Sequence, residues 1–195
     1  MSIAFKLLSK SITGVLSLND AKDHLRIPQA DTSQDDLINA YISAAIQTAE
    51  DETERKIGLS KYQFRIPAKV MTMDLPYQEF KAITKLTQIT EDGTETVLYD
   101  VDADPVGDYL IYIKPDPYTV PPQLKVLDAI PDDVEYYLIE ATFQMDLISD
   151  SIMQGIKMVL YHYYDNNTAV EVGRTANEVP MGAKMLFHNN RFMRF

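Results

Sequence analysis

The chain has 195 residues and a mass of 22.2 kDa, and its 46% hydrophobic and 24% charged residues are typical of a folded globular protein and exclude wholesale disorder. Its 18 basic and 29 acidic residues give a formal net charge of -11, which argues against a protein whose main task is to hold nucleic-acid phosphates. The absence of cysteine excludes disulfides, thiolate nucleophiles and zinc sites with cysteine ligands.

The negative charge is concentrated in the middle of the chain. Residues 62–148 carry 6 basic and 16 acidic side chains, whereas residues 1–61 carry 7 and 9 and residues 149–195 carry 5 and 4. Two explanations are open: the acidic residues lie in loops that solvate a sheet, or they form an acidic lining or rim of an assembly. The first ten residues lack a signal-peptide pattern and no apolar run reaches the roughly 20 residues that span a bilayer, so we expect a soluble cytosolic chain with no membrane partner.

The first predicted helix begins after Ser17. Ser17 is followed three residues later by Asp20, a variant of the capping box, and apolar residues then recur at helical spacing. We expect a short helix over residues 18–26, which ends before Pro28.

The second predicted helix is long and rich in alanine. Ser33 and Asp36 repeat the capping pattern, and apolar residues follow at i, i+3, i+4 and i+7, so we expect a helix over residues 34–57 with Gly58 as its C-cap. Small side chains let a neighbouring helix approach closely, whether from the same chain or from another copy. They are Ala40, Ala44, Ala45 and Ala49.

The middle third has the composition of strands. Its β-branched and aromatic residues stand in short runs separated by Pro, Gly and Asp, and Asp92-Gly93 is typical of a hairpin turn. Four prolines at positions 115, 117, 121 and 122 predict a loop or an irregular edge. The expected strands cover residues 62–67, 83–90, 95–99, 109–114 and 134–143.

The last third is helical again. Apolar residues on one face predict a helix over residues 150–166, and a short helix is expected over residues 180–187 with Pro180 at its first position. The predicted fold class is therefore α+β: a helical bundle with an inserted antiparallel β module. The helical domain comprises residues 1–61 and 149–195, and the β module residues 62–148.

The chain offers little catalytic chemistry. His162 and Asp165 lie one helical turn apart and could share a metal ion, but no third ligand is indicated. Glycine-rich phosphate loops and the nucleophile elbow of hydrolases are missing from the sequence. We therefore expect no enzyme, no catalytic residue, no cofactor and no metal site.

One acidic segment imitates a calcium loop. Asp100, Asp102 and Asp104 match the first three ligands of an EF-hand. Pro105 stands where the loop requires glycine, and Ile111 stands where a bidentate carboxylate is required. Calcium binding of this type is disfavoured.

Four stretches of the chain together carry a family resemblance through their order. They are residues 16–26, 35–55, 83–98, and 152–167 with 179–182. In this order they resemble the head-tail connector (adaptor) proteins of tailed bacteriophages, in the longer variety with a β insert. The first resembles the opening helix of that family, the second its long helix, the third the hairpin of its insert, and the last its terminal helix and the following proline turn.

This resemblance implies a structural role in the virion, with assembly in the host cytoplasm. The family forms a ring of about twelve copies beneath the portal, which extends the DNA channel and offers a docking surface to stopper or tail proteins. DNA would pass through without specific binding, as the acidic composition also favours. Open alternatives are another neck or tail-completion protein, a metal-dependent enzyme using His162, Asp165 and carboxylates of the β insert, and a DNA-packaging regulator that binds nucleic acid directly.

Two groups of residues are candidate interaction sites. The alanine-bearing helix and the tyrosines of the last long helix suit contact between subunits, and the terminal segment combines basic with apolar side chains suited to contact with the portal protein. The expected subunit interface is Ala40, Tyr41, Ala44, Ala45, Tyr161 and Tyr164, and the expected portal-binding tail is Arg191, Phe192, Met193, Arg194 and Phe195.

Overall fold

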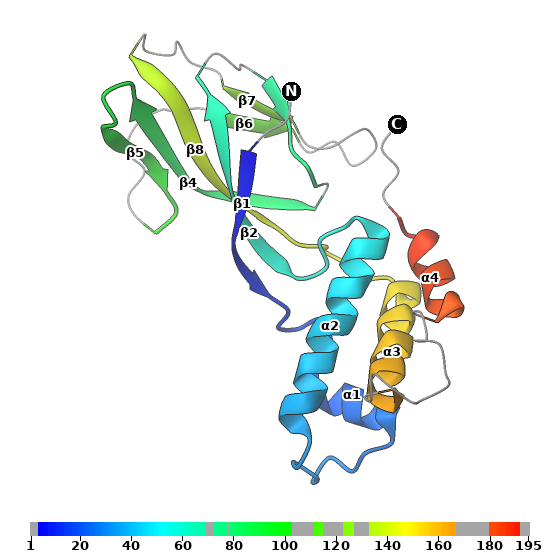
Figure 1. Cartoon of the computed structure of the whole chain (residues 1–195). Coiled ribbons are helices and arrows are strands. Elements are labelled where there is room, and N and C mark those ends of the chain that lie inside the picture. Colours follow the sequence, from blue (N-terminus) through cyan, green and yellow to red (C-terminus); the bar gives the residue numbers. More distant parts are fainter. Residues whose placement is uncertain are drawn as a thin grey trace, which may run out of the picture. The chain divides into compact units, whose positions relative to one another are not determined.

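The computed structural model describes residues 4–68, 72–77, 79–102, 111–114, 123–126, 133–166 and 180–191. These residues divide into two compact units, which are described separately (Figure 1). A helical unit contains residues 12–58 and the described residues from 145 onward, and a sheet unit contains residues 4–11 and the described part of 59–144. The fold is α+β, a helical bundle with an antiparallel β module, as predicted.

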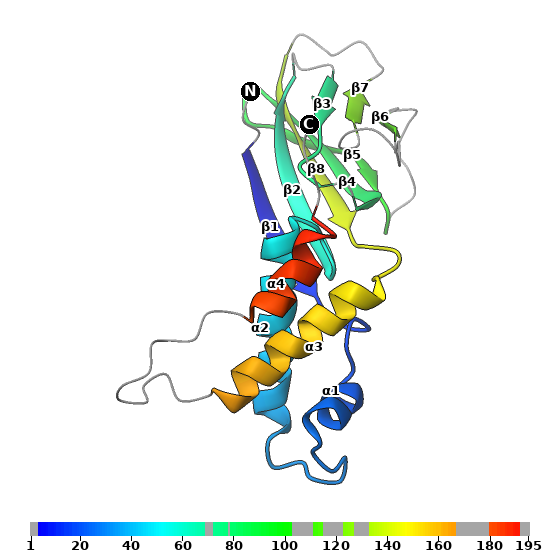
Figure 2. The same ribbon diagram turned by 90° about the vertical axis from the view of Figure 1, so that its right-hand side faces the viewer.

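The described part of the helical unit contains four helices, close to the predicted positions. Figure 2 shows α3 running beside α2 with α4 packed on α3, and α1 contacts both α2 and α3. None of the helices in the described ranges has the length and apolarity to cross a membrane. The helices are α1 (Leu18–Leu25), α2 (Asp35–Thr53), α3 (Asp150–Asp165) and α4 (Met181–His188).

The caps at the starts of the helices confirm one prediction and correct two. The Ser17 hydroxyl accepts a hydrogen bond from the Asp20 backbone N–H (3.1 Å) and donates one to the Asp20 carboxylate (2.6 Å), so the predicted cap of α1 is confirmed. The cap predicted at Ser33 is wrong: Ser33 donates instead to Asp31, and α2 begins after Gln34 without a side-chain cap. Pro180 is the N-cap residue of α4, one position earlier than expected.

The end of α2 also differs from the prediction. The helix stops at Thr53, and Glu54 takes the left-handed conformation (φ 56°), so Gly58 is not its C-cap. The reason is the buried carboxylate of Glu50, whose Oε1 accepts hydrogen bonds from the backbone N–H groups of Ile57 (3.0 Å) and Gly58 (2.9 Å). These bonds use N–H groups that a longer helix would bond to its own carbonyls, and α2 has 19 residues, or roughly 28 Å.

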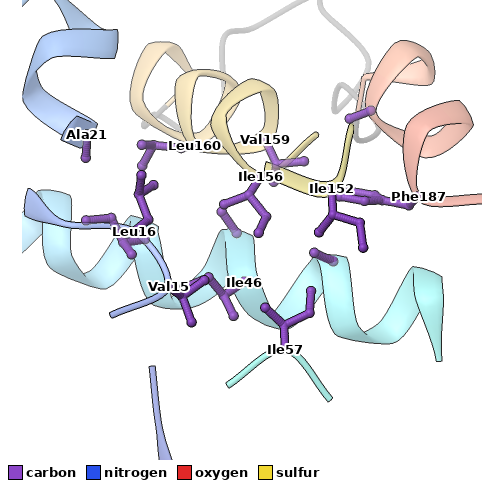
Figure 3. Close-up of a cluster of buried hydrophobic side chains, with 14 of the residues drawn as sticks. Val15, Leu16, Ala21, Ile46, Ile57, Ile152, Ile156, Val159, Leu160 and Phe187 are labelled. Atoms are coloured by element: carbon purple, nitrogen blue, oxygen red, sulfur yellow. The ribbon is translucent and has the colours of Figure 1, made fainter. Parts of the chain in front are cut away.

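The core of the helical unit lies between α2 and α3. Both helices bury apolar side chains at helical spacing, and residues before α1 and from α4 close the cluster (Figure 3). Ser149 caps α3 by accepting from the Ile152 N–H, which directs the first apolar residue of α3 inward. Fully buried members are Ala21, Ile38, Ala45, Ile46, Ala49, Ile57, Ile152, Ile156, Val159, Leu160, Ala183 and Phe187.

Gly155 allows α4 to approach α3. A Cβ added at Gly155 would lie 2.5 Å from Cε1 and 2.9 Å from Cζ of the Phe187 ring. Phe187 is completely buried and Figure 3 shows it beside the first turns of α3, so the ring could move away only by displacing its neighbours in the close-packed core. Only glycine at position 155 is compatible with this contact.

Lys22 is buried although it is charged. Its side chain is 2% exposed, and its ammonium group donates to the backbone carbonyls of Asp31 (2.8 Å) and Gln29 (3.3 Å) and pairs with the Asp35 carboxylate. The group therefore satisfies two carbonyls of the loop between α1 and α2 and one acid at the start of α2. These three contacts of the Lys22 ammonium group fix the conformation of the loop.

The sheet unit contains a five-stranded antiparallel sheet in the order β1-β2-β8-β4-β5 and a three-stranded sheet in the order β3-β7-β6. Strands β2, β4, β5, β6 and β8 were predicted, and β1, β3 and β7 were not. The strands are β1 (Ala4–Ser11), β2 (Leu59–Pro67), β3 (Thr72–Asp74), β4 (Phe80–Thr90), β5 (Glu95–Asp100), β6 (Ile111–Lys114), β7 (Gln123–Val126) and β8 (Val134–Phe143).

Three boundaries of the predicted domains change as a result. Residues 4–11 and 59–61 were assigned to the helical domain, but they form β1 and the start of β2, which pair in the sheet unit. Residues 145–148 were assigned to the β module, but they belong to the helical unit, where the Met145 N–H donates to the Lys56 carbonyl (2.7 Å). Residues 109 and 110 of the predicted fourth strand, and the four prolines of the predicted loop, lie outside the described residues.

The predicted hairpin turn is confirmed. Gly93 has φ 83°, and the Asp92 carboxylate accepts from the Thr90 hydroxyl (2.6 Å) and the Thr94 backbone N–H (2.9 Å). These bonds lower the pKa of Asp92, the Thr90 hydroxyl first, because they favour the ionised carboxylate. The turn therefore connects β4 and β5 in a fixed antiparallel register.

Aromatic contacts on one face and ion pairs between neighbouring strands stabilise the five-stranded sheet. One face holds an aromatic cluster of Phe5, Tyr62, Phe64, Tyr77 and Phe143, whose ring centroids are 5.2 to 6.4 Å apart. These edge-on and tilted contacts suit the charge distribution of aromatic rings. Charged side chains also pair across neighbouring strands: Lys61 with Glu140 (2.7 Å), Arg65 with Glu135 (3.4 Å) and Lys85 with Asp100 (3.9 Å).

Replacement of Lys22 tests the buried ammonium group. We expect Lys22→Met to lower the free energy of unfolding by about 3 kcal/mol, because it leaves two carbonyls and the Asp35 carboxylate without their partner. Urea unfolding followed by circular dichroism measures the change. The exposed Lys6→Met is the matched control and should change stability by less than about 0.5 kcal/mol; equal effects of the two variants would contradict the structural role of Lys22.

Two glycine substitutions test the contact of α3 with α4. Gly155→Ala should destabilise the protein by about 1 to 3 kcal/mol, because the methyl group collides with the Phe187 ring. Gly182→Ala is the control: its Cβ would meet only the flexible end of Met158, at 3.0 Å, and alanine is the better helix former. Thermal unfolding compares the two, and a stabilised Gly155→Ala variant would show that α4 does not pack as described.

Candidate functional site

The exposed face of α2 contains part of the predicted subunit interface. Ala40 and Ala44 are exposed, and Leu37, one turn before, keeps 39% of its surface exposed. Ala45 is completely buried in the core of the helical unit, so it is not accessible to another subunit. The candidate surface is therefore the stripe Leu37, Ala40 and Ala44, which we call the α2 face.

The predicted interface tyrosines connect helices within the chain. Tyr41 packs against Tyr163, with ring centroids 6.4 Å apart, and the Tyr163 hydroxyl is 2.9 Å from the Thr48 hydroxyl. The Tyr164 hydroxyl donates to the Gln34 side chain (2.9 Å) beside the start of α2. Tyr41 and Tyr164 therefore hold α2 against α3, and neither contact depends on a second copy.

Tyr161 is different, because half of its surface is exposed and it lines a cleft. The cleft has a volume of about 650 Å³ and lies between the ends of α1 and α3 and the start of α4. Its polar lining includes basic and acidic groups on opposite helices. The lining residues are His24, Leu25, Arg26, Met158, Tyr161, His162, Asp165, Asn166 and Pro180.

His24 is the titratable group of this cleft with a clear shift. Partial burial lowers the pKa of His24, and the positive charge of Lys157 lowers it further, while a hydrogen bond to the Lys157 backbone opposes the change. Since both main causes disfavour the imidazolium, His24 is neutral at pH 7. It supplies a hydrogen-bonding contact between α1 and α3 and no fixed charge.

The candidate metal ligands do not assemble. His162 and Asp165 both line the cleft, but the His162 ring is 3.3 Å from the Asn166 amide, and the described residues contain no group of three acidic or histidine side chains that would hold a metal ion. In the EF-hand-like segment, the Asp100 carboxylate accepts from the Asp102 backbone N–H (3.1 Å), which is an ordinary turn. Asp104 and Pro105 lie outside the described residues.

The predicted tail begins at an ion pair. The Arg191 guanidinium pairs with the Glu54 carboxylate, at the residue that ends α2. Just before it, Asn190 bonds to Ser149 and Ser151 at the start of α3, so the end of α4 is held to two other helices. The remaining tail residues Phe192, Met193, Arg194 and Phe195 lie outside the described residues.

Sequence reasoning missed the buried polar groups and the exposed methionines. Lys22 follows Ala21 on a helix whose apolar pattern is short, and Glu50 stands in an acidic run, so neither residue type signals burial. Met181 and Met185 lie one turn apart on α4 and remain 80% and 64% exposed. Their helical spacing was visible in the sequence, but only the position of α4 on α3 shows which face is free.

Comparison with known proteins identifies the kind of protein this chain resembles. Residues 15–101 match the family model of the phage gp6-like head-tail connector protein, and this range covers α1, α2 and strands β2 to β5. This match confirms the resemblance predicted from the sequence and supports the predicted neck adaptor role. No match is found among curated proteins.

Solved structures of gene transfer agent particles share the fold. A chain in the neck of an empty GTA particle, computed with C6 symmetry, has a TM-score of 0.71 and 18% identity, and the match covers 98% of this chain and 97% of that chain. A chain in the virion of the native particle has a TM-score of 0.67 and 19% identity, and the match covers 98% of this chain and 96% of that chain. A chain in the neck of the native particle, computed with C12 symmetry, has a TM-score of 0.67 and 17% identity, and the match covers 98% of this chain and 97% of that chain.

The neutral state of His24 predicts how stability depends on pH. Since the pKa of His24 is lowered in the folded chain, its contribution to stability is fully present above the ordinary value of 6.5 and is lost as the pH falls through the lowered pKa. His24→Gln keeps a side-chain N–H donor for the Lys157 backbone and removes the titratable imidazole. Urea midpoints at about pH 7.5 and 5.5 should therefore differ less for His24→Gln than for the parent chain.

The control for this measurement is the exposed His188 at the end of α4. His188→Gln should retain the pH dependence of the parent chain. An unchanged pH dependence in His24→Gln would show that burial at the cleft does not determine the titration.

Proposed function

We propose that this protein is a structural head-tail adaptor that forms a ring in the neck of a phage-like particle and surrounds the path of the DNA. The observation that carries the proposal is the agreement of two independent comparisons. The connector family model covers α1, α2 and the β4–β5 hairpin, and chains of particle necks match over nearly the full length of both partners. The virion is therefore the proposed location, and the host cytoplasm the place of assembly.

The proposed ring brings the α2 face of one copy against the next copy. Ala40 and Ala44 present little more than backbone, so another helix can pack closely there, and Leu37 adds apolar surface at the end of the stripe. Related chains in particles computed with C6 and C12 symmetry support cyclic assembly. A ring of about twelve copies is the proposed state in the particle. Of the predicted tyrosines, Tyr161 has half of its surface exposed for such a contact.

The proposed partners of the ring are the portal protein on one side and a stopper or tail-completion protein on the other. The segment Arg191–Phe195 is the proposed contact with the portal protein, since it combines two arginines with three apolar residues and begins at the ion pair between Arg191 and Glu54. The net charge of -11 keeps DNA from adhering to the ring during passage. The proposed role requires no catalysis, cofactor or metal ion.

A charge placed on the α2 face tests the ring. We expect Ala44→Glu to weaken assembly with the cognate portal protein at least tenfold, or about 1.4 kcal/mol, because the carboxylate would be buried without a partner between two copies. Mass photometry and negative-stain microscopy measure ring formation. Asn39→Glu adds the same charge at an exposed position on the flank of α2 and should leave rings intact.

Circular dichroism should show that both variants are folded. Rings formed equally by Ala44→Glu and the parent chain would exclude the α2 face as the interface. A parent chain that stays monomeric in the presence of its portal protein would contradict the adaptor function as a whole.

A further inference from the structure

The five-stranded sheet ends in two edge strands that complement each other. Strand β1 pairs only with β2 and strand β5 only with β4 among the described strands, so each leaves one row of backbone N–H and C=O groups without a ladder (Figure 1). Proteins usually cover or charge such edges, because a free edge accepts a further strand. The properties of the two edges show which strand each would accept.

The two edges carry opposite charge. Strand β1 contains Lys6 and Lys10, and residues 1–19 include no acidic side chain. Strand β5 contains Glu95 and Asp100 and follows a turn with Glu91 and Asp92, and no Lys or Arg occurs between residues 86 and 113. Within the described chain neither Lys6 nor Glu95 has an ion-pair partner.

Both edges also expose apolar side chains. On β1, Phe5 and Leu7 keep 48% and 46% of their surface exposed, and Phe5 lies at the margin of the aromatic cluster against Tyr62. On β5, Val97 is 42% exposed, and Val101 directly after the strand is 54% exposed. Apolar groups gathered along a strand edge, with opposite charges beside them, are typical of surfaces that bind another protein segment.

We propose that β1 of one copy docks along β5 of the next copy, so that the sheets of neighbouring copies join edge to edge. Attraction between the Lys6 side of one copy and the Glu95 side of another favours this unlike contact. A symmetric contact of two β1 edges, or of two β5 edges, would place like charges together. The contact is heterologous, and heterologous contacts are the kind that close into rings.

The direction of the strands agrees with cyclic repetition. All neighbours in the sheet are antiparallel, so β1 and β5, which are separated by three strands, run in the same direction. Neighbours in a ring of many copies are related by a small rotation, which preserves strand direction. The edges therefore meet in parallel. This step rests on the ring of the proposed function, but the edge contact uses a surface separate from the α2 face.

The natural absence of cysteine makes a direct test simple. Ser9→Cys places one thiol on the exposed edge strand β1, and Thr96→Cys places one on β5, without removing a charge. A mixture of the two variants, treated with a short bismaleimide at low ionic strength, should give a cross-linked pair on a denaturing gel. Each variant alone should stay monomeric, and a chain with both substitutions should give a ladder of multimers.

Charge and position are controlled separately. Asn19→Cys, exposed on α1, should not cross-link with Thr96→Cys. Adding Lys6→Glu to the β1 variant should lower the yield of the mixed pair at least fivefold, and adding Glu95→Lys to the β5 variant should restore it. The restored yield separates a charge contact from simple loss of folding.

Three results would overturn the edge contact: no cross-link in the mixture, Ser9→Cys cross-linking equally well with itself, or no effect of Lys6→Glu. The ring itself is tested independently by Ala44→Glu with the portal protein. Rings that form normally while the edges fail to cross-link would therefore remove the edge contact and leave the adaptor function in place.

Discussion

The helical unit depends on one apolar contact, the packing of α2 against α3. α1 packs on both helices, α4 packs on α3 and also contacts α2, and all four helices contribute to a single core cluster. Removing this surface from water supplies most of the favourable free energy, and the polar groups fix the helix ends and the loop between α1 and α2. Gly155 then sets how closely α4 and its buried Phe187 ring can approach.

The elements built on apolar periodicity were predictable from the sequence. The spacing in α2 and α3 gave their buried faces, and Asp92-Gly93 gave the β4–β5 turn. Helix ends were less predictable, because side chains compete for the same backbone groups. Ser33 bonds to Asp31 and not to α2, and Glu50 accepts the N–H groups of residues that would otherwise have extended the helix. Strand β1 has exposed residues on both faces and hence no alternating pattern.

The candidate surfaces were predictable in part. The exposed alanines of α2 follow from helical geometry. Ala44 and Ala45 are neighbours in sequence, but Ala44 is exposed and Ala45 is completely buried. Tyr41 and Tyr164 are used within the chain, which only the positions of their hydroxyl and ring partners show. The complementary sheet edges depend on strand order, and strand order joins segments far apart in sequence, such as β2 with β8. Local patterns carry no information on such pairings.

The bond from the Met145 N–H to the Lys56 carbonyl has an evolutionary consequence. It holds the points where the chain leaves the helical bundle, near Gly58, and returns to it, at Met145, at hydrogen-bonding distance from each other. Glu50 fixes the outgoing side of this junction from within the bundle. The chain therefore leaves and re-enters the bundle at one point, so segments inserted between residues 58 and 145 can change in length during evolution while the helices keep their packing, provided that β2 still pairs with β1.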